Sequence, residues 1–243
     1  MMFCLRVIAL LAILALMAIV GTAQAITPPP TTDFRTWFAY NGDHRLRDSR
    51  LSLVLESQLR VYEIVDRSGV VTFRTGLQYD IRNWLRVSGG YGYQITEPGS
   101  GLDGIPEHRA WEGLQLRQRM GQVQLNHRVR LEQRWLAPEI AGDPYEYHNR
   151  VRYATRAIIP ITKHADKKYY VTVMNEVFIN FGKGTRNVFD QNRTGASFGY
   201  HLGAIGNLET GYILQAQNSA EHIMAYHNIL TFALVSTFPF GKH

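Results

Sequence analysis

The residues best placed to do chemistry in this sequence are arginines and glutamates that alternate with apolar residues. Segment 128–134 reads Arg-Val-Arg-Leu-Glu-Gln-Arg, so charges recur at every second position or close to it. A period of two places these side chains on one face of a β-strand. We expect that face to carry a charge ladder with one tryptophan in it: Glu56, Arg60, Arg109, Trp111, Arg128, Arg130, Glu132, Arg134, Arg152 and Glu176. The guanidinium fork suits fixed carboxylates and small anions alike. The ladder therefore predicts either structural ion pairs or a charged constriction that selects solutes.

A turn at Met120-Gly121 predicts how two of these strands pair. The pairs expected to lie opposite each other are Arg109 with Glu132, Glu107 with Arg134, and Trp111 with Arg130. Opposite charges then face each other, and the tryptophan can stack on a guanidinium group. This register favours the structural ladder and leaves the selective constriction open as the alternative.

Enzymatic constellations are weak in this sequence. The same register places Glu112 diagonally beside His127 on the apolar face, where ionisable groups are costly. No serine of these strands lies beside them, so a lipid hydrolase is only a distant alternative. Arginines around Glu132 and Glu176 favour ion pairing over acid catalysis. The histidines lack metal-ligand spacing, and arginines enclosed in a barrel cannot reach a duplex. We predict no catalytic residue, metal, cofactor or nucleic-acid partner.

The first 25 residues have the pattern of a secretory signal peptide. An apolar core precedes Ala23-Gln24-Ala25, whose small residues fit a leader peptidase site with cleavage after Ala25. The one cysteine, Cys4, lies within this segment, so we expect no disulfide. Residues 26–33 contain three consecutive prolines and are expected to form an extended spacer. No later apolar stretch approaches the roughly 20 residues of a transmembrane helix.

The rest of the chain alternates apolar and polar residues in segment after segment. The expected strands are 34–44, 50–62, 70–80, 84–95, 107–119, 122–135, 150–161, 169–181, 191–202, 207–217 and 225–238. Tight turns alternate with longer loops between them, as in outer-membrane barrels. Bacterial single-chain barrels have an even number of strands. Either ten strands close the barrel and residues 34–44 lie in the lumen or periplasm, or a twelfth strand is present.

The polarity of the two faces predicts the environment of these strands. The 243-residue chain is 45% hydrophobic and 12% aromatic with a net charge of +6, which excludes a disordered chain. A soluble barrel has an apolar interior, whereas here the polar face carries many arginines, and aromatic residues gather near strand ends. We therefore predict an all-β, antiparallel transmembrane β-barrel of 10 to 12 strands with a polar, Arg-rich lumen, formed by residues 34–243. A soluble lipid-carrying barrel or sandwich is the alternative.

A succession of short motifs resembles a known family. The motifs include Trp37, Gly76-Leu-Gln-Tyr79, Gly90-Tyr-Gly-Tyr93 and the segment 128–134, and they span most of the chain. Their order resembles the uncharacterised family called domain of unknown function 2490. The resemblance implies a β-barrel in the outer membrane of a Gram-negative bacterium, and it implies no activity. The chain departs from such barrels at its end, where Gly-Lys-His follows Phe240.

These observations together predict a function class rather than a reaction. We expect an outer-membrane β-barrel that forms a passive pore for small, anionic solutes, with a non-conducting structural or interaction barrel as the alternative. The expected partners are outer-membrane lipid, the outer-membrane assembly machinery and a small-molecule solute that the sequence does not identify.

Overall fold

The computed structural model describes residues 31–62, 67–97, 104–138, 143–161, 168–183, 185, 187–218 and 223–241. The expected signal peptide with Ala23 and Ala25, and the first part of the spacer, lie outside the described residues. The first strand begins at Thr31, within the segment expected to be a spacer. In the described part of the chain, no helix is long and apolar enough to span a membrane.

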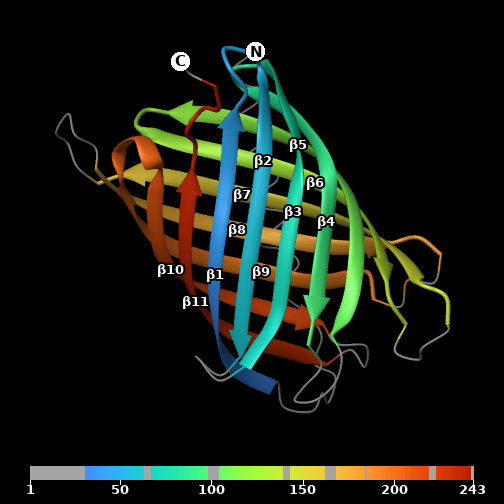
Figure 1. Ribbon diagram of the computed structural model, residues 1–243. Coiled ribbons are helices and arrows are strands. Elements are labelled where there is room, and N and C mark those ends of the chain that lie inside the picture. Colours follow the sequence, from blue (N-terminus) through green and yellow to red (C-terminus); the bar gives the residue numbers. More distant parts are fainter. Residues whose placement is uncertain are drawn as a thin grey trace, which may run out of the picture. The chain divides into compact units, whose positions relative to one another are not determined.

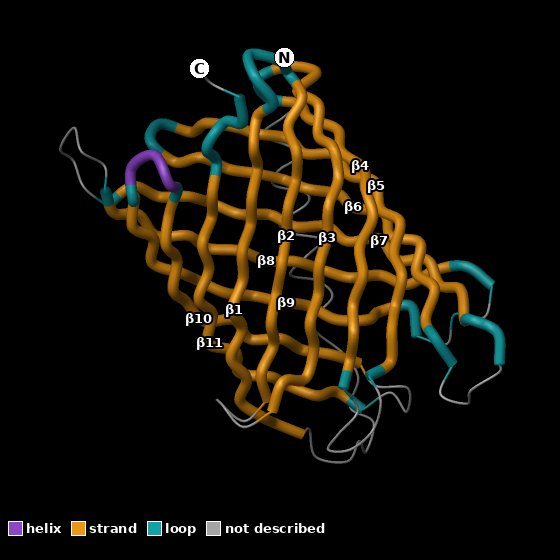
Figure 2. The backbone as a smooth tube through the Cα atoms, viewed as in Figure 1, coloured by secondary structure: helices purple, strands orange, loops and turns teal. Residues whose placement is uncertain are grey.

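In the part of the chain that the structure describes, eleven strands form one closed barrel (Figure 1). They are β1 (Thr31–Arg45), β2 (Leu51–Tyr62), β3 (Arg67–Arg82), β4 (Leu85–Thr96), β5 (Ile105–Met120), β6 (Val123–Leu136), β7 (Glu146–Pro160), β8 (Tyr169–Phe181), β9 (Phe189–His201), β10 (Asn207–Asn218) and β11 (Met224–Ser236). Each predicted strand matches one of these to within a few residues. The described residues contain one short 3-10 helix, η1 (Gly203–Ile205), between β9 and β10. It is the purple segment in Figure 2.

The closure of the barrel corrects the expectation of an antiparallel sheet with an even number of strands. Neighbouring strands are antiparallel everywhere except where β1 meets β11, and that pair is parallel. A ring of alternating strand directions closes only with an even number, so eleven strands must leave one parallel pair. This seam is long, running from Thr31 beside Ala225 to Gly42 beside Ser236. The segment 34–44 is therefore part of the barrel wall, not a lumenal or periplasmic segment.

The hairpin between β5 and β6 corrects the predicted register. Met120 lies opposite Val123, so the two turn residues are Gly121 and Gln122. Gly121 has φ +63°, the left-handed value that a glycine adopts most easily at the first position of such a turn. Moving the turn by one residue shifts every pair by two, so Trp111 lies opposite Glu132. A shift of two preserves the faces of both strands while changing each partner.

The two ends of the barrel differ in their connections. At one end, the strands are joined by the connections 63–66, 97–104, 137–145, 182–188 and 219–223. Strands β1 and β11 both begin at this end. We name it the long-loop end. The other end carries 46–50, 83–84, 121–122, 161–168 and 202–206. We name it the tight-turn end, although the connection 161–168 is longer than the alternation of the sequence predicts.

Burial along the strands follows the period of two, with unusual polarity. Large apolar side chains such as Phe38, Leu77 and Val173 are about half exposed, at 46%, 50% and 47%. The alternate positions hold buried charged residues, among them Arg109 and Glu132. The apolar side of the wall thus faces outward, and the packed side chains inside the barrel are largely polar.

Candidate functional site: the buried arginine and glutamate side chains

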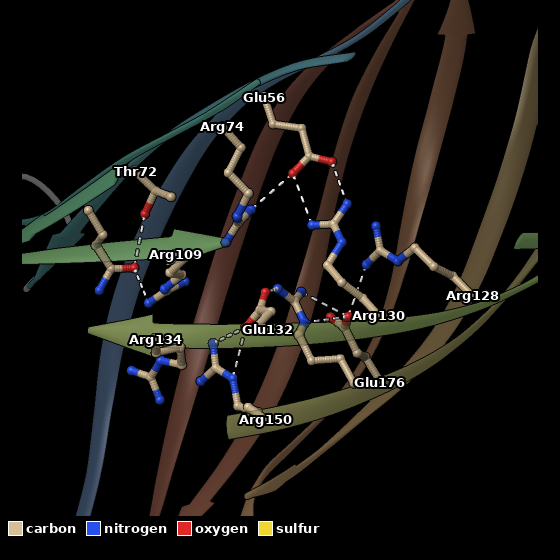
Figure 3. A network of polar contacts seen from close by, with 12 residues as sticks. Glu56, Thr72, Arg74, Arg109, Arg128, Arg130, Glu132, Arg134, Arg150 and Glu176 are labelled. Carbon is tan, nitrogen blue, oxygen red and sulfur yellow. Dashed lines mark hydrogen bonds and ion pairs between the residues drawn. The ribbon is translucent and has the colours of Figure 1, made fainter. Parts of the chain in front are cut away.

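Glu56 links two strands that are not neighbours in the sheet. Its carboxylate on β2 accepts hydrogen bonds from Nη1 of Arg74 on β3 and Nη2 of Arg130 on β6, each at 3.0 Å (Figure 3). Three strands separate β2 from β6 in the sheet, so the second contact crosses the enclosed space. The Cζ atom of Arg130 also lies 4.4 Å from the ring centroid of Trp111. The predicted cation–π contact is therefore present, although the two residues are diagonal rather than opposite.

Glu132 is the most deeply enclosed charge among the described residues, with an exposed side-chain fraction of 0%. Its Oε2 accepts from Nη2 of Arg150 at 2.6 Å, and its Oε1 accepts from Nη1 of Arg152 at 2.8 Å. Arg152 also donates to Glu176 at 2.8 Å, and Glu176 accepts from Arg128 at 2.9 Å. Charges thus alternate in sign across β6, β7 and β8. Removing one member of such a chain leaves its buried partners uncompensated.

Glu107 holds a second cluster near the long-loop end. It accepts from Nε of Arg109 and Nε of Arg134, both at 2.5 Å. The predicted pair of Glu107 with Arg134 is therefore formed, across a diagonal of the β5–β6 ladder. The predicted pair of Arg109 with Glu132 is wrong, because the shifted register places Arg109 opposite Arg134. Arg109 instead bonds to Glu107 and to Gln94, the latter at 2.9 Å.

All ten predicted ladder residues are buried or half-buried. We call the side chains joined by these ion pairs the paired network; it comprises Glu56, Glu107, Glu132, Glu176, Arg74, Arg109, Arg128, Arg130, Arg134, Arg150 and Arg152. Glu107 was predicted only as the partner of Arg134, and Arg74 and Arg150 were not in the predicted ladder. Both occupy polar positions of alternating strands, so the pattern could have revealed them, but nothing in the sequence assigns their partners.

Arg60 and Arg193 differ from the arginines of the paired network because neither forms an ion pair with a carboxylate of the described residues. Nε of Arg60 donates to Gln58 at 2.9 Å, and Nε of Arg193 donates to Gln215 at 2.9 Å. Their Cζ atoms lie 4.7 and 4.8 Å from the ring centroid of Trp37. We call Arg60 and Arg193 the unpaired arginines. The predicted ladder contained only the first of them.

Two cavities lie among these side chains. The first has a volume of about 370 Å³ and the second about 400 Å³, and both are lined by Arg60, Arg74, Arg152 and Arg193. Eight arginines line the first cavity, which extends to the long-loop end, and Asp190 is the one carboxylate among its described lining residues. The second cavity extends toward the tight-turn end and includes Glu56, Glu176 and Glu209. The arrangement can attract and hold anions.

The structure separates the residues that suggested a hydrolase. Glu112 lies opposite Leu131, and His127 lies opposite Leu116, so the two are not diagonal neighbours. His127 instead shares a hydrogen bond of 2.9 Å with the hydroxyl of Tyr153. Among the described residues, no three His, Cys, Asp or Glu side chains gather as they would around a metal ion.

Comparisons with known proteins agree with the order of the motifs. No curated protein and no solved structure matches the chain. A family model described as "Protein of unknown function (DUF2490)" matches residues 34–225, from within β1 to the beginning of β11. The match covers most of the chain and confirms the resemblance seen in the sequence. The chain therefore belongs to the DUF2490 family of proteins of unknown function.

Proposed function

We propose that this protein is a β-barrel of the outer membrane of a Gram-negative bacterium and acts as a passive pore for small anionic solutes. The observation that carries the proposal is a barrel with an apolar outer surface that encloses two adjoining cavities, both lined by the same four arginines. The proposal has two parts, the membrane and the anion, and each rests on its own contacts.

The outer surface supports the membrane. Every strand presents at least one large apolar side chain that is more than a third exposed. Water would penalise an apolar surface spread over all eleven strands, whereas lipid requires it. Aromatic pairs lie at both ends: the ring centroids of Trp135 and Tyr147 are 5.4 Å apart at the long-loop end, and those of Tyr169 and Tyr200 are 5.1 Å apart at the tight-turn end. Aromatic girdles at both interfaces are typical of outer-membrane barrels.

The balance of charge supports an anionic solute. Eight arginines and one aspartate line the first cavity. Six of these arginines are ion-paired with carboxylates, so the attraction for anions comes mainly from the two unpaired arginines. Arg60, Arg74, Arg152 and Arg193 line the second cavity as well, so a solute passing between the cavities would meet these four guanidinium groups.

A non-conducting structural or interaction barrel is the second candidate, and the cross-barrel contact favours it. The Glu56–Arg130 ion pair and the fully buried Glu132 place side chains across the interior. If these side chains are immobile, the barrel is filled rather than open. A lipid-acting hydrolase remains a distant third alternative, since Glu112 and His127 are apart.

Planar-bilayer recording of the refolded protein tests the proposed pore. We expect discrete current steps. When a KCl gradient is applied, the sign of the reversal potential should show that chloride permeates more readily than potassium. A cation-selective current would contradict the anionic solute. An absence of current from protein that migrates faster unboiled than boiled in SDS gels would contradict the pore.

Cell fractionation tests the membrane part separately. We expect the protein in the outer-membrane fraction, inserted in outer-membrane lipid by the assembly machinery. Its intact mass should be that of a chain that begins at Ile26. Recovery as a soluble periplasmic protein would overturn this part of the proposal.

A further inference from the structure

The two unpaired arginines reach the same aromatic ring from different parts of the barrel wall. Arg60 on β2 lies directly opposite Trp37 on β1. Arg193 projects from β9, which β10 and β11 separate from β1. The indole of Trp37 is 3% exposed, and Arg193 is 7% exposed. Both guanidinium groups are thus held against a fixed apolar surface, which favours a defined geometry.

Both arginines retain free hydrogen-bond donors. Each uses its Nε atom on a glutamine, and neither has an acceptor for its terminal Nη atoms among the described residues. The charges that act most strongly on Arg60 all have its own sign; they belong to Arg193, Arg109, Arg74 and Arg152. A cluster of like charges in a confined space is unfavourable unless an anion compensates it.

The surroundings of the pair suit an organic anion better than a bare halide. The first cavity also contains the buried amides of Gln94, Gln191 and Gln215. An amide both donates and accepts hydrogen bonds, as the hydroxyl groups of a polyol or sugar require. A guanidinium fork binds the paired oxygens of a carboxylate or phosphate in a bidentate manner.

We propose that Arg60 and Arg193 form a binding site for the carboxylate or phosphate group of a small hydroxylated solute. The inference rests on the proposed function because it names the solute class of the pore. Binding itself requires neither a membrane nor an open passage, so it can be measured independently of conduction.

Isothermal titration calorimetry on the refolded barrel in detergent micelles tests the site. The probes are glucose 6-phosphate, gluconate and inorganic phosphate, with glucose as the neutral comparison. We expect the two organic anions to bind more tightly than inorganic phosphate, and glucose not to bind. Binding of only one organic anion supports the site and identifies its anionic group. If no probe anion binds, the proposal is wrong.

Substitutions locate the binding. Arg193→Gln should lower the affinity for the organic anions about tenfold, because one charged hydrogen-bonding partner is lost. The double variant Arg60→Gln/Arg193→Gln should show no measurable binding. The exposed Arg50 supplies the matched control, since Arg50→Gln removes the same charge away from both cavities. Fast migration of unboiled samples verifies that each variant is folded. Unchanged affinity in the folded double variant would overturn the proposal.

The two hypotheses fail in different ways. A wild-type barrel that conducts chloride but binds no probe anion in micelles refutes the site and leaves the pore intact. A barrel that binds the anions through Arg60 and Arg193 but passes no current supports the site and refutes the pore.

Discussion

The interior of this barrel uses arginine in two different ways. On β6, β7 and β8, Arg150, Arg152 and Arg128 are joined through Glu132 and Glu176, so each of these arginines has a carboxylate partner. Arg60 and Arg193, from β2 and β9, have only glutamine and aromatic partners among the described residues. The difference teaches that the identity of a buried residue does not give its role. The side-chain partners of each arginine do: arginines paired with carboxylates hold the strands together, and arginines without a carboxylate partner are free to bind a ligand.

The largest effect is expected where the paired network is broken. Glu132→Gln leaves Arg150 and Arg152 with one carboxylate fewer, and breaking a buried pair costs about 3 to 5 kcal/mol. We expect the fast-migrating form to be lost at a clearly lower temperature. Glu146→Gln is the control, because the side chain of Glu146 is 71% exposed. Equal thermal stability of the two variants would show that the network does not stabilise the barrel.

An arginine added to the outer surface sharpens the contrast between the two faces of the wall. Leu125 faces outward on β6 and the adjacent Asn126 lines the second cavity. If the outer surface contacts lipid, Leu125→Arg should reduce the stability of the inserted barrel by about 2 to 4 kcal/mol near the membrane midplane. Asn126→Arg should have a mild effect. Denaturant titration in lipid vesicles gives both values, and a reversed order would show that the assignment of faces is wrong.

The smallest effect on stability is expected at the unpaired arginines. Arg60→Gln removes a charge surrounded mainly by other arginines, whereas Arg193→Gln removes one that repels Arg152 and is attracted by Glu176. Each variant also loses a stacking contact with Trp37. These contributions oppose each other, so we expect changes below about 1 kcal/mol. A loss as large as that of Glu132→Gln would place Arg60 or Arg193 in the structural group and remove the distinction.

The strands were predictable because their period of two and the turn residues between them are local properties of the sequence. The parallel seam was not, because no local feature of residues 34–44 states that β11 will be their neighbour. The predicted register of β5 and β6 was wrong because the turn was placed at Met120-Gly121, one residue before its position at Gly121 and Gln122. The Glu107–Arg134 pair survived this error because diagonal partners remain within reach of long side chains.

The site was predictable in composition but not in connectivity. Alternation placed Glu56 and Arg130 on the inner face, yet their contact across the barrel depends on how the whole sheet closes. Arg150 sits at the start of its predicted strand and was left out of the ladder, although it bonds to Glu132. The distinction between paired and unpaired arginines therefore required the three-dimensional structure.

The most direct test of the account is the reversal potential of the refolded protein in a KCl gradient, compared between the wild-type chain and the Arg60→Gln/Arg193→Gln variant. The account predicts an anion-selective wild-type current and a variant of equal thermal stability whose selectivity falls toward that of free solution. Unchanged anion selectivity in the folded variant, or a wild-type barrel that carries no current, would contradict it.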